Sequence, residues 1–215
     1  MQFDFPAMKP MDRYELLLGT VLPRPIAIVT TLSGGGALNA APYSLFNVVS
    51  HDPPVLMIAV LPHPERRLKD TAANIFETRE FVVNLVPRSM AEAMNITNID
   101  APPGQNELAL AGLDVTPSKS VKPPRIATSP VAFECRLLTS LSFNSDQAVL
   151  FGEVVTAIVP DHLVIDAARA LSTRRGSICL ARCMQRVGMA RLRTASRWCV
   201  RLGSNGWTKG KCSFS

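Results

Sequence analysis

Residues 39–54 read NAAPYSLFNVVSHDPP, and this stretch indicates more about the fold than any other in the chain. Small, amide and hydroxyl side chains such as Asn39, Ser44 and Asn47 alternate here with bulky apolar ones. Ordinary core strands are built from β-branched and aromatic residues and avoid Asn and Pro, so strand propensity is low at several of these positions. Departures of this kind tend to mark functional or strained sites. The pattern favours a strand that holds a flat polar ring and a phosphate, with an irregular, bulged edge strand as the structural alternative.

The composition suits one globular domain with a substantial core, with or without an appendage. The chain has 215 residues, of which 47% are apolar. It contains no run of eighteen apolar residues, so we expect no membrane span. The first residues, MQFDFPAMKPMDR, carry an early acid and two prolines in place of an apolar signal core. We therefore predict a cytoplasmic protein.

The net charge of +6 is distributed unevenly. Residues 1–166 hold 12 Lys and Arg against 17 Asp and Glu, whereas residues 167–215 hold 11 Lys and Arg and no acid. Four of the five cysteines and both tryptophans also lie in the second part. We therefore divide the chain into a domain over 1–166 and a divergent basic tail over 167–215. A tail of this kind is typical of arms that bind nucleic acid or a membrane surface.

Hydrophobic patterns and turn residues predict the elements between residues 24 and 165. Strands are expected over 24–31, 38–50, 55–60, 81–86, 131–139, 149–159 and 163–165, with a flexible turn at 33–36. Helices are expected after a cap at Asp70, after a capping box from Ser89 to Glu92, and over 106–111. Strands at hairpin-like spacing with short helices favour a decorated β-barrel over βαβ repeats.

The segment PHPERRLKDT, residues 62–71, leads directly into the predicted helix at Asp70. Basic side chains beside the open N–H groups of a helix N-terminus form a natural phosphate cradle. Arg67 or Lys69 could hold the phosphate while Thr71 donates a hydroxyl hydrogen bond. A solvated charged loop that caps the helix explains the same residues equally well.

Other kinds of site find little support in the sequence. The turn at 33–36 lacks the spacing of a nucleotide-binding glycine loop. The three histidines are far apart and the pair Cys179 and Cys183 is isolated, so we predict no metal site. The chain has no nucleophile elbow of the hydrolase type.

Taken together, these segments resemble the flavin reductase-like family from about Arg24 to Ile165. The resemblance is carried in order by RPIAIVTT, NAAPYSLFNVVSHDPP, KDTAANI, EFVVNLV, EAMNITNIDAPPGQNELALAGL, VKPPRIATSPVAFECRL and LFGEVVTAIV. It implies a mainly β fold with short helices, the FMN-binding split β-barrel. It also implies an NAD(P)H-dependent flavin reductase that transfers hydride from NADH or NADPH to FMN. The alternative is a non-catalytic, flavoredoxin-like FMN carrier or electron-transfer protein.

The resemblance also implies partners and site residues. We expect a homodimer, a partner monooxygenase or other electron acceptor, and neither specific nucleic acid nor membrane binding. The strand over 39–50 would line the flavin ring, and the segment over 67–71 would hold the phosphate. The implied cofactor-binding residues are Thr30, Thr31, Asn39, Ala41, Pro42, Ser44, Asn47, Arg67, Lys69, Asp70 and Thr71. No catalytic residue is assigned, because the cofactor carries the hydride chemistry.

The resemblance stops near Arg182, where relatives continue with an Arg-Met-His-Gly-Gly-Gly-like loop and a mildly acidic end. Read from the third base of the Arg182 codon, the next residues can encode Met-His-Ala-Ala-Gly-Gly-Tyr-Gly. By the same shift, NGWTKG at 205–210 can encode Glu-Trp-Leu-Asp-Glu-Gly. We therefore hypothesise a single-base deletion that replaces the residues from about 183 onward. The alternative is a genuine basic tail, whose functional role would be nonspecific nucleic-acid binding.

Overall fold

The computed structural model describes residues 1–62, 68–98 and 106–166, with four short strands in the rest of the chain. The chain divides into two compact units, one made of residues 1–23 and 182–215 and the other of residues 24–181. The first unit holds helix α1 (Pro10–Thr20), which the sequence analysis did not predict, and strands β14 (Arg201–Gly203) and β15 (Gly206–Thr208). No helix of the described residues has the length and hydrophobicity needed to cross a membrane.

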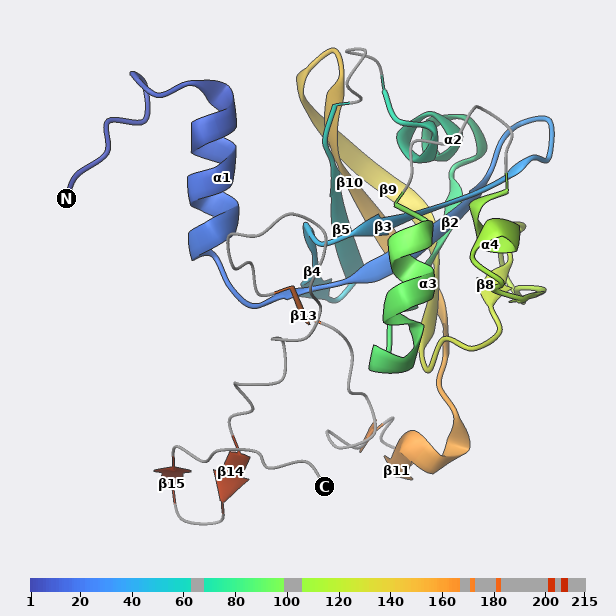
Figure 1. Cartoon of the computed structure of the whole chain (residues 1–215). Coiled ribbons are helices and arrows are strands. Elements are labelled where there is room, and N and C mark those ends of the chain that lie inside the picture. The colour runs from blue at the N-terminus through green and yellow to red at the C-terminus, as the bar shows by residue number, and fades with distance from the viewer. Residues whose placement is uncertain are drawn as a thin grey trace. The chain divides into compact units, whose positions relative to one another are not determined.

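The second unit is mainly β with short helices, as the sequence predicts (Figure 1). Its longer strands are β2 (Ala27–Leu32), β3 (Leu38–Tyr43), β4 (Phe46–His51), β5 (Pro54–Val60), β6 (Glu80–Leu85), β9 (Ala132–Asn144) and β10 (Gln147–Ile158). Its helices are α2 (Asp70–Thr78), α3 (Ala91–Ile96), α4 (Glu107–Leu110) and the 3₁₀ turns η1 (Arg88–Met90) and η2 (Asp161–Leu163). Its short strands are β1 (Arg24–Pro25), β7 (Val115–Thr116), β8 (Arg125–Ile126), β11 (Val164–Asp166) and β12 (Leu171–Ser172). In the sequence, strand β13 (Ala181–Arg182) spans the point where the second unit ends and the first unit resumes.

Seven strands form one antiparallel sheet in the order β3-β2-β6-β9-β10-β5-β4. Strands β3 and β4 lie at its opposite edges, although only Ser44 and Leu45 separate them in the chain. The sheet therefore curls until its two edges meet, which makes a barrel that is open along the β3/β4 seam. The single strand predicted over 38–50 is wrong for this reason. The chain changes edge at this point, where the N–H of Ala59 donates to the Leu45 carbonyl at 2.8 Å.

Side chains alternate between the inside and the outside of this barrel. The interior core contains Ala27, Val29, Tyr43, Phe46, Leu56, Ile58, Val60, Phe81, Val83, Cys135, Leu137, Ala148 and Leu150. Helix α2 packs onto this core through Ala72 and Ile75. A second cluster joins the outer face of β2 and β3 to α3 and α4 through residues such as Ile28, Met94 and Leu108. The short helices thus cover one side of the barrel, which Figure 1 shows for α3 and α4.

Two of the predicted helix caps differ from the structure. Asp70 is the first residue of α2 and not its cap, which is Lys69 in extended conformation. The box from Ser89 to Glu92 makes no side-chain capping bond, because residues 88–90 first form the 3₁₀ turn η1. The helical turn predicted over 106–111 is confirmed as α4, and the side-chain oxygen of its N-cap Asn106 accepts from the N–H groups of Leu108 and Ala109. The turn at 33–36 is also confirmed, with Gly36 at φ +85°.

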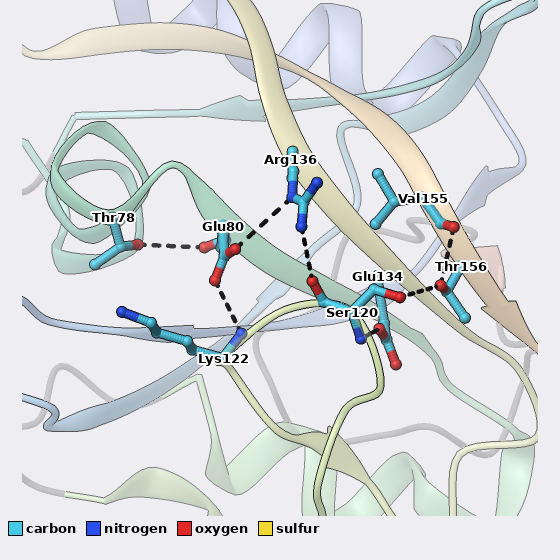
Figure 2. Close-up of polar contacts among 8 residues, drawn as sticks. All are labelled: Thr78, Glu80, Ser120, Lys122, Glu134, Arg136, Val155 and Thr156. Carbon is cyan, nitrogen blue, oxygen red and sulfur yellow. Dashed lines mark hydrogen bonds and ion pairs between the residues drawn. The ribbon is translucent and has the colours of Figure 1, made fainter.

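The proline-rich segment 117–130 crosses the outside of the sheet and is held there by two carboxylates (Figure 2). The buried carboxylate of Glu134 accepts from the N–H of Lys119 at 2.8 Å and from the N–H of Ser120 at 2.6 Å. The Glu80 carboxylate accepts from the N–H of Lys122 at 2.9 Å. Hydrogen bonds to a charged acceptor are stronger than neutral ones, so these contacts fix the crossing segment firmly.

Gly152 on β10 leaves room for the ring of Phe81 in the barrel core. A Cβ at this position would lie 2.3 Å from Cζ of the fully buried Phe81. We expect Gly152→Ala to lower the free energy of unfolding by about 1–3 kcal/mol, because a packed core accommodates an added methyl group poorly. Urea denaturation measures this loss. Gly19→Ala in α1 is the control, because nothing lies within 4 Å of its added Cβ; equal stability changes would contradict the packing account.

Candidate functional site

A polar cluster lies where β2 and β3 meet the start of α2. The side-chain amide of Asn39 donates to Oγ1 of Thr71 at 2.9 Å and to Oγ1 of Thr31 at 3.2 Å. Asn74 on α2 donates to the same Thr31 oxygen at 3.0 Å. Thr31 and Thr71 are buried, whereas Asn39 is half-buried. The structure therefore brings the predicted residues Thr31 and Asn39 of one hairpin together with Thr71, which lies 32 residues beyond Asn39.

Asn39 is the residue of this cluster that has a side-chain atom available to bind a ligand. Its two amide hydrogens are used by the two threonine hydroxyls. Its carbonyl oxygen accepts no hydrogen bond from the described residues and stays available to a hydroxyl or N–H donor. The buried threonines thus orient Asn39 and leave one polar atom for recognition.

The N-terminus of α2 lies beside this cluster and has the properties of an anion site. The helix begins at Asp70, and no side chain caps it. The first N–H groups of an α-helix have no intrahelical acceptor, and the helix dipole makes this end positive. Lys69, the half-buried N-cap, adds a cation. This end of α2 can therefore receive a phosphate or carboxylate.

Tyr43 on β3 carries a buried hydroxyl near the same helix end. The side chain is 7% exposed, and its hydroxyl lies near the Thr71 hydroxyl without completing a hydrogen bond of good geometry to any described residue. Burial raises the pKa of Tyr43, the contact with the Thr71 hydroxyl lowers it, and the charges of Asp70 and Glu107 raise it slightly further. A buried hydroxyl without a partner costs free energy, so it marks a position where a ligand group would be favourable.

Glu107 begins α4 and closes the free edge of β3. The residue is 9% exposed, and its carboxylate accepts from the Ala40 N–H at 3.1 Å. Burial raises the pKa of Glu107, the hydrogen bonds from its own N–H and that of Ala40 lower it, and the charge of Asp70 raises it. Two carboxylates and one phenol therefore share the corner between β3, α2 and α4.

The remaining predicted site residues on β2 and β3 have other surroundings. Thr30 lies on the opposite face of β2, where its hydroxyl donates to the Pro124 carbonyl at 2.6 Å and accepts from Asn84 at 3.2 Å. The N–H of Ala40 points to the free edge of β3, so by strand alternation the Ala41 N–H faces β2. Pro42 has no N–H group. Its nitrogen faces the free edge of β3, where no hydrogen bond to a neighbouring strand is needed.

The other predicted residues lie further along the chain. Ser44 is half-buried in the bend between β3 and β4. Asn47 is exposed on β4, and its side-chain oxygen accepts from the N–H of Val48 at 2.8 Å. Among the described residues, no hydrogen bond joins either side chain to Asn39, Thr31, Thr71 or Asn74. Arg67 lies outside the described residues.

The family described as the flavin reductase like domain matches residues 18–174. The chain belongs to the flavin reductase-like family. Its split β-barrel is the fold of that family's solved structures, as the sequence resemblance predicts.

Three proteins illustrate the similarity to other members. An uncharacterized protein of Aquifex aeolicus is 47% identical over 151 residues, which is 70% of this chain and 76% of that protein. The 2-nitrobenzoate 2-nitroreductase NbaA of Pseudomonas fluorescens is 38% identical with a TM-score of 0.72, covering 80% of this chain and 82% of that one. Component B of nitrilotriacetate monooxygenase from Bacillus cereus is 34% identical with a TM-score of 0.71, covering 76% and 83%.

Sequence reasoning missed three residues of the site: Tyr43, Asn74 and Glu107. Asn74 is three residues after Thr71, so one turn of a helix places both on the same face. Tyr43 reads as an ordinary apolar strand residue, and its unpartnered hydroxyl is visible only in three dimensions. Glu107 follows a capping Asn and reads as a solvated first-turn acid, because no sequence pattern indicates its contact with β3.

Proposed function

We propose that this protein is an NAD(P)H-dependent flavin reductase that binds FMN at the corner between β3 and the N-terminus of α2. The observation that carries the proposal is the Asn39 side chain, which joins the strand predicted to line the ring to Thr71 at the helix end. This contact makes one continuous site from two segments 32 residues apart in sequence. FMN has a ring system and a phosphate at its two ends, so it matches a site of this form.

The residues present fit FMN chemically. An uncapped helix N-terminus with Lys69 beside it suits a phosphate. The open carbonyl oxygen of Asn39 suits a ribityl hydroxyl or ring N–H, and the unpartnered Tyr43 hydroxyl offers one more polar contact. When bound, FMN supplies the hydride-accepting chemistry of the reaction. The chain's own residues bind and orient the cofactor.

Each predicted residue has a place in this proposal. Lys69, Asp70 and Thr71 surround the phosphate, with Thr71 acting through its N–H group and its bond to Asn39. Ala41, Pro42, Ser44 and Asn47 follow the ring along the seam of the barrel. Thr30 contributes indirectly, because its hydroxyl anchors the crossing segment at Pro124. Arg67 remains a proposed phosphate contact.

The proposed partners are inferred from the similarity to other flavin reductase-like proteins and from the open edge of the sheet. We propose a homodimer, because the edge strand β4 exposes Val48 and Val49, which are 68% and 52% exposed. We also propose that reduced flavin passes to a monooxygenase or another acceptor. The similarity to component B of nitrilotriacetate monooxygenase supports the first acceptor class, and the similarity to a nitroreductase supports a small nitroaromatic acceptor.

Two measurements on the purified full chain test the proposed function. After incubation with FMN and gel filtration, we expect flavin absorption bands in the protein fraction, and we expect added NADH or NADPH to be oxidised. Flavin that is retained without nicotinamide oxidation would indicate the carrier or electron-transfer alternative. Absence of both retained flavin and nicotinamide oxidation would contradict the proposal.

We further propose that a single-base deletion near the Arg182 codon produced the residues from about 183 onward. The family match ends at residue 174, and the alternative frame restores the acids that residues 167–215 lack. Resequencing the gene through this codon tests the proposal. An intact reading frame would contradict it and would leave the basic tail as a genuine part of the protein.

A further inference from the structure

Asn74 lies on the side of α2 that contacts the hairpin of β2 and β3. It comes three residues after Thr71, so the two side chains share one side of the helix. Thr71 accepts from Asn39 on β3 at 2.9 Å, and Asn74 donates to Oγ1 of Thr31 on β2 at 3.0 Å. Asn74 is only 8% exposed, so its contact with Thr31 is largely shielded from solvent. One side of α2 is thus hydrogen-bonded to both strands of the hairpin.

The Thr31 hydroxyl joins the contacts of Asn74 and Asn39. Its oxygen accepts from the Asn39 amide at 3.2 Å as well as from the Asn74 amide, and Thr31 is fully buried. A hydroxyl has two lone pairs and one proton, so the two amides use both lone pairs and the proton points away from them. Asn39 therefore meets an acceptor at Thr31. This keeps the Asn39 N–H groups toward the threonines and its carbonyl oxygen available to a ligand.

We propose that Asn74 is a positioning residue for the flavin, which acts through the Thr31 hydroxyl on the orientation of Asn39. This inference rests on the proposed function, because it requires that Asn39 contacts FMN. The amide of an asparagine turns easily about its last side-chain bond, so its orientation depends on its hydrogen-bond partners. Without the Asn74 donor, the Thr31 hydroxyl turns more freely and can present its proton to Asn39. The Asn39 amide can then turn over, and the flavin meets an N–H group in place of the carbonyl oxygen.

The variant Asn74→Ala removes the donor to Thr31. We expect it to weaken FMN binding about three- to tenfold, which corresponds to the loss of about one neutral hydrogen bond. Quenching of FMN fluorescence during titration measures the affinity. At saturating FMN, the visible absorption bands of the bound flavin should shift from their wild-type positions, because the group that Asn39 presents to the flavin has changed.

A double-mutant cycle with Asn39→Ala decides whether Asn74 acts through Asn39. Two residues that act on the same contact have effects that do not add, whereas the effects of independent residues add. In the Asn39→Ala background, we therefore expect Asn74→Ala to change FMN affinity by less than about twofold. Thr31→Val removes the oxygen between the two amides and keeps a β-branched side chain, so it should weaken FMN binding by about three- to tenfold as well.

Two controls separate positioning from a general loss of stability. Glu77, three residues after Asn74, also attaches α2 to the hairpin, because its carboxylate accepts from the Gly34 N–H at 2.9 Å. This contact is made at the turn of the hairpin, so Glu77→Ala should keep the wild-type affinity for FMN. Gly152→Ala lowers stability through the barrel core and should also leave FMN affinity and the visible bands unchanged. Urea denaturation measures the stability of each variant.

The outcomes separate the role of Asn74 from the function on which it rests. An Asn74→Ala protein with wild-type FMN affinity, or an equal loss in the wild-type and Asn39→Ala backgrounds, would overturn the positioning role alone. An equal loss in Glu77→Ala or Gly152→Ala would overturn it too. Failure of the wild-type protein to bind FMN would overturn the proposed function as well. If Asn74→Ala does not fold, Thr31→Val decides, and wild-type FMN affinity in that variant would contradict the inference.

Discussion

Replacing Asn39 by alanine is expected to weaken FMN binding by about ten- to a hundredfold. The Asn39 amide is the shared partner of the Thr31 and Thr71 hydroxyls, both of which are buried. Thr31 keeps its hydrogen bond from Asn74, but the buried Thr71 hydroxyl loses its donor, at about 1–3 kcal/mol, and every 1.4 kcal/mol is a factor of ten in affinity. The strand and the helix end then lose their common orientation. Quenching of FMN fluorescence during titration measures the loss.

Asn98→Ala is the matched control for this change. Asn98 is exposed and lies beyond α3, away from the contacts of β3. It should bind FMN as tightly as wild type. An Asn39→Ala protein that is folded and binds FMN within twofold of wild type would contradict the placement of the site.

The largest loss of stability is expected for Glu134→Ala. Glu134 is fully buried, and its carboxylate accepts from the N–H of Lys119 at 2.8 Å and from the N–H of Ser120 at 2.6 Å. Figure 2 shows the Ser120 contact. Its removal leaves both N–H groups without an acceptor and frees the crossing segment. Breaking a buried charged contact of this kind costs about 3–5 kcal/mol. Urea denaturation should show this decrease in the free energy of unfolding.

Two further variants define the cause of that decrease. Glu92→Ala removes an exposed carboxylate from α3 and should change stability by less than about 0.5 kcal/mol. Glu134→Gln offers one acceptor oxygen in place of two and should fall between wild type and Glu134→Ala. A Glu134→Ala protein within 1 kcal/mol of wild type would show that the crossing segment has other sufficient anchors.

Local patterns predicted most strands correctly. A strand is indicated by the alternation of apolar and polar residues and by the turn residues at its ends, which act over only a few positions. The run VLMIAV became β5, and FVVNLV became most of β6. The same reasoning failed at 38–50, where one expected strand is two strands on opposite edges of the sheet. A change of edge depends on closure of the whole barrel, which no local pattern contains.

The segments of the candidate site were proposed from the sequence, whereas the contacts that join these segments are visible only in the structure. The mixed composition of 39–50 and the basic approach to Asp70 pointed to ring and phosphate recognition from the residues alone. The Asn39 contact with Thr71 and the Glu107 contact with Ala40 join distant parts of the chain. Thr30 and Thr31 show the limit most clearly. They are adjacent in sequence, yet one anchors Pro124 and the other accepts from Asn39.

The most direct test of the account is a comparison of FMN with riboflavin in binding to the full-length wild-type protein. The two molecules differ by the phosphate alone, which the account places at the N-terminus of α2. We predict one FMN bound per chain and an affinity at least about tenfold higher than that for riboflavin, as a phosphate on a helix N-terminus implies. Equal affinity for the two flavins would contradict the phosphate site, and binding of neither would contradict the assignment of flavin to this barrel.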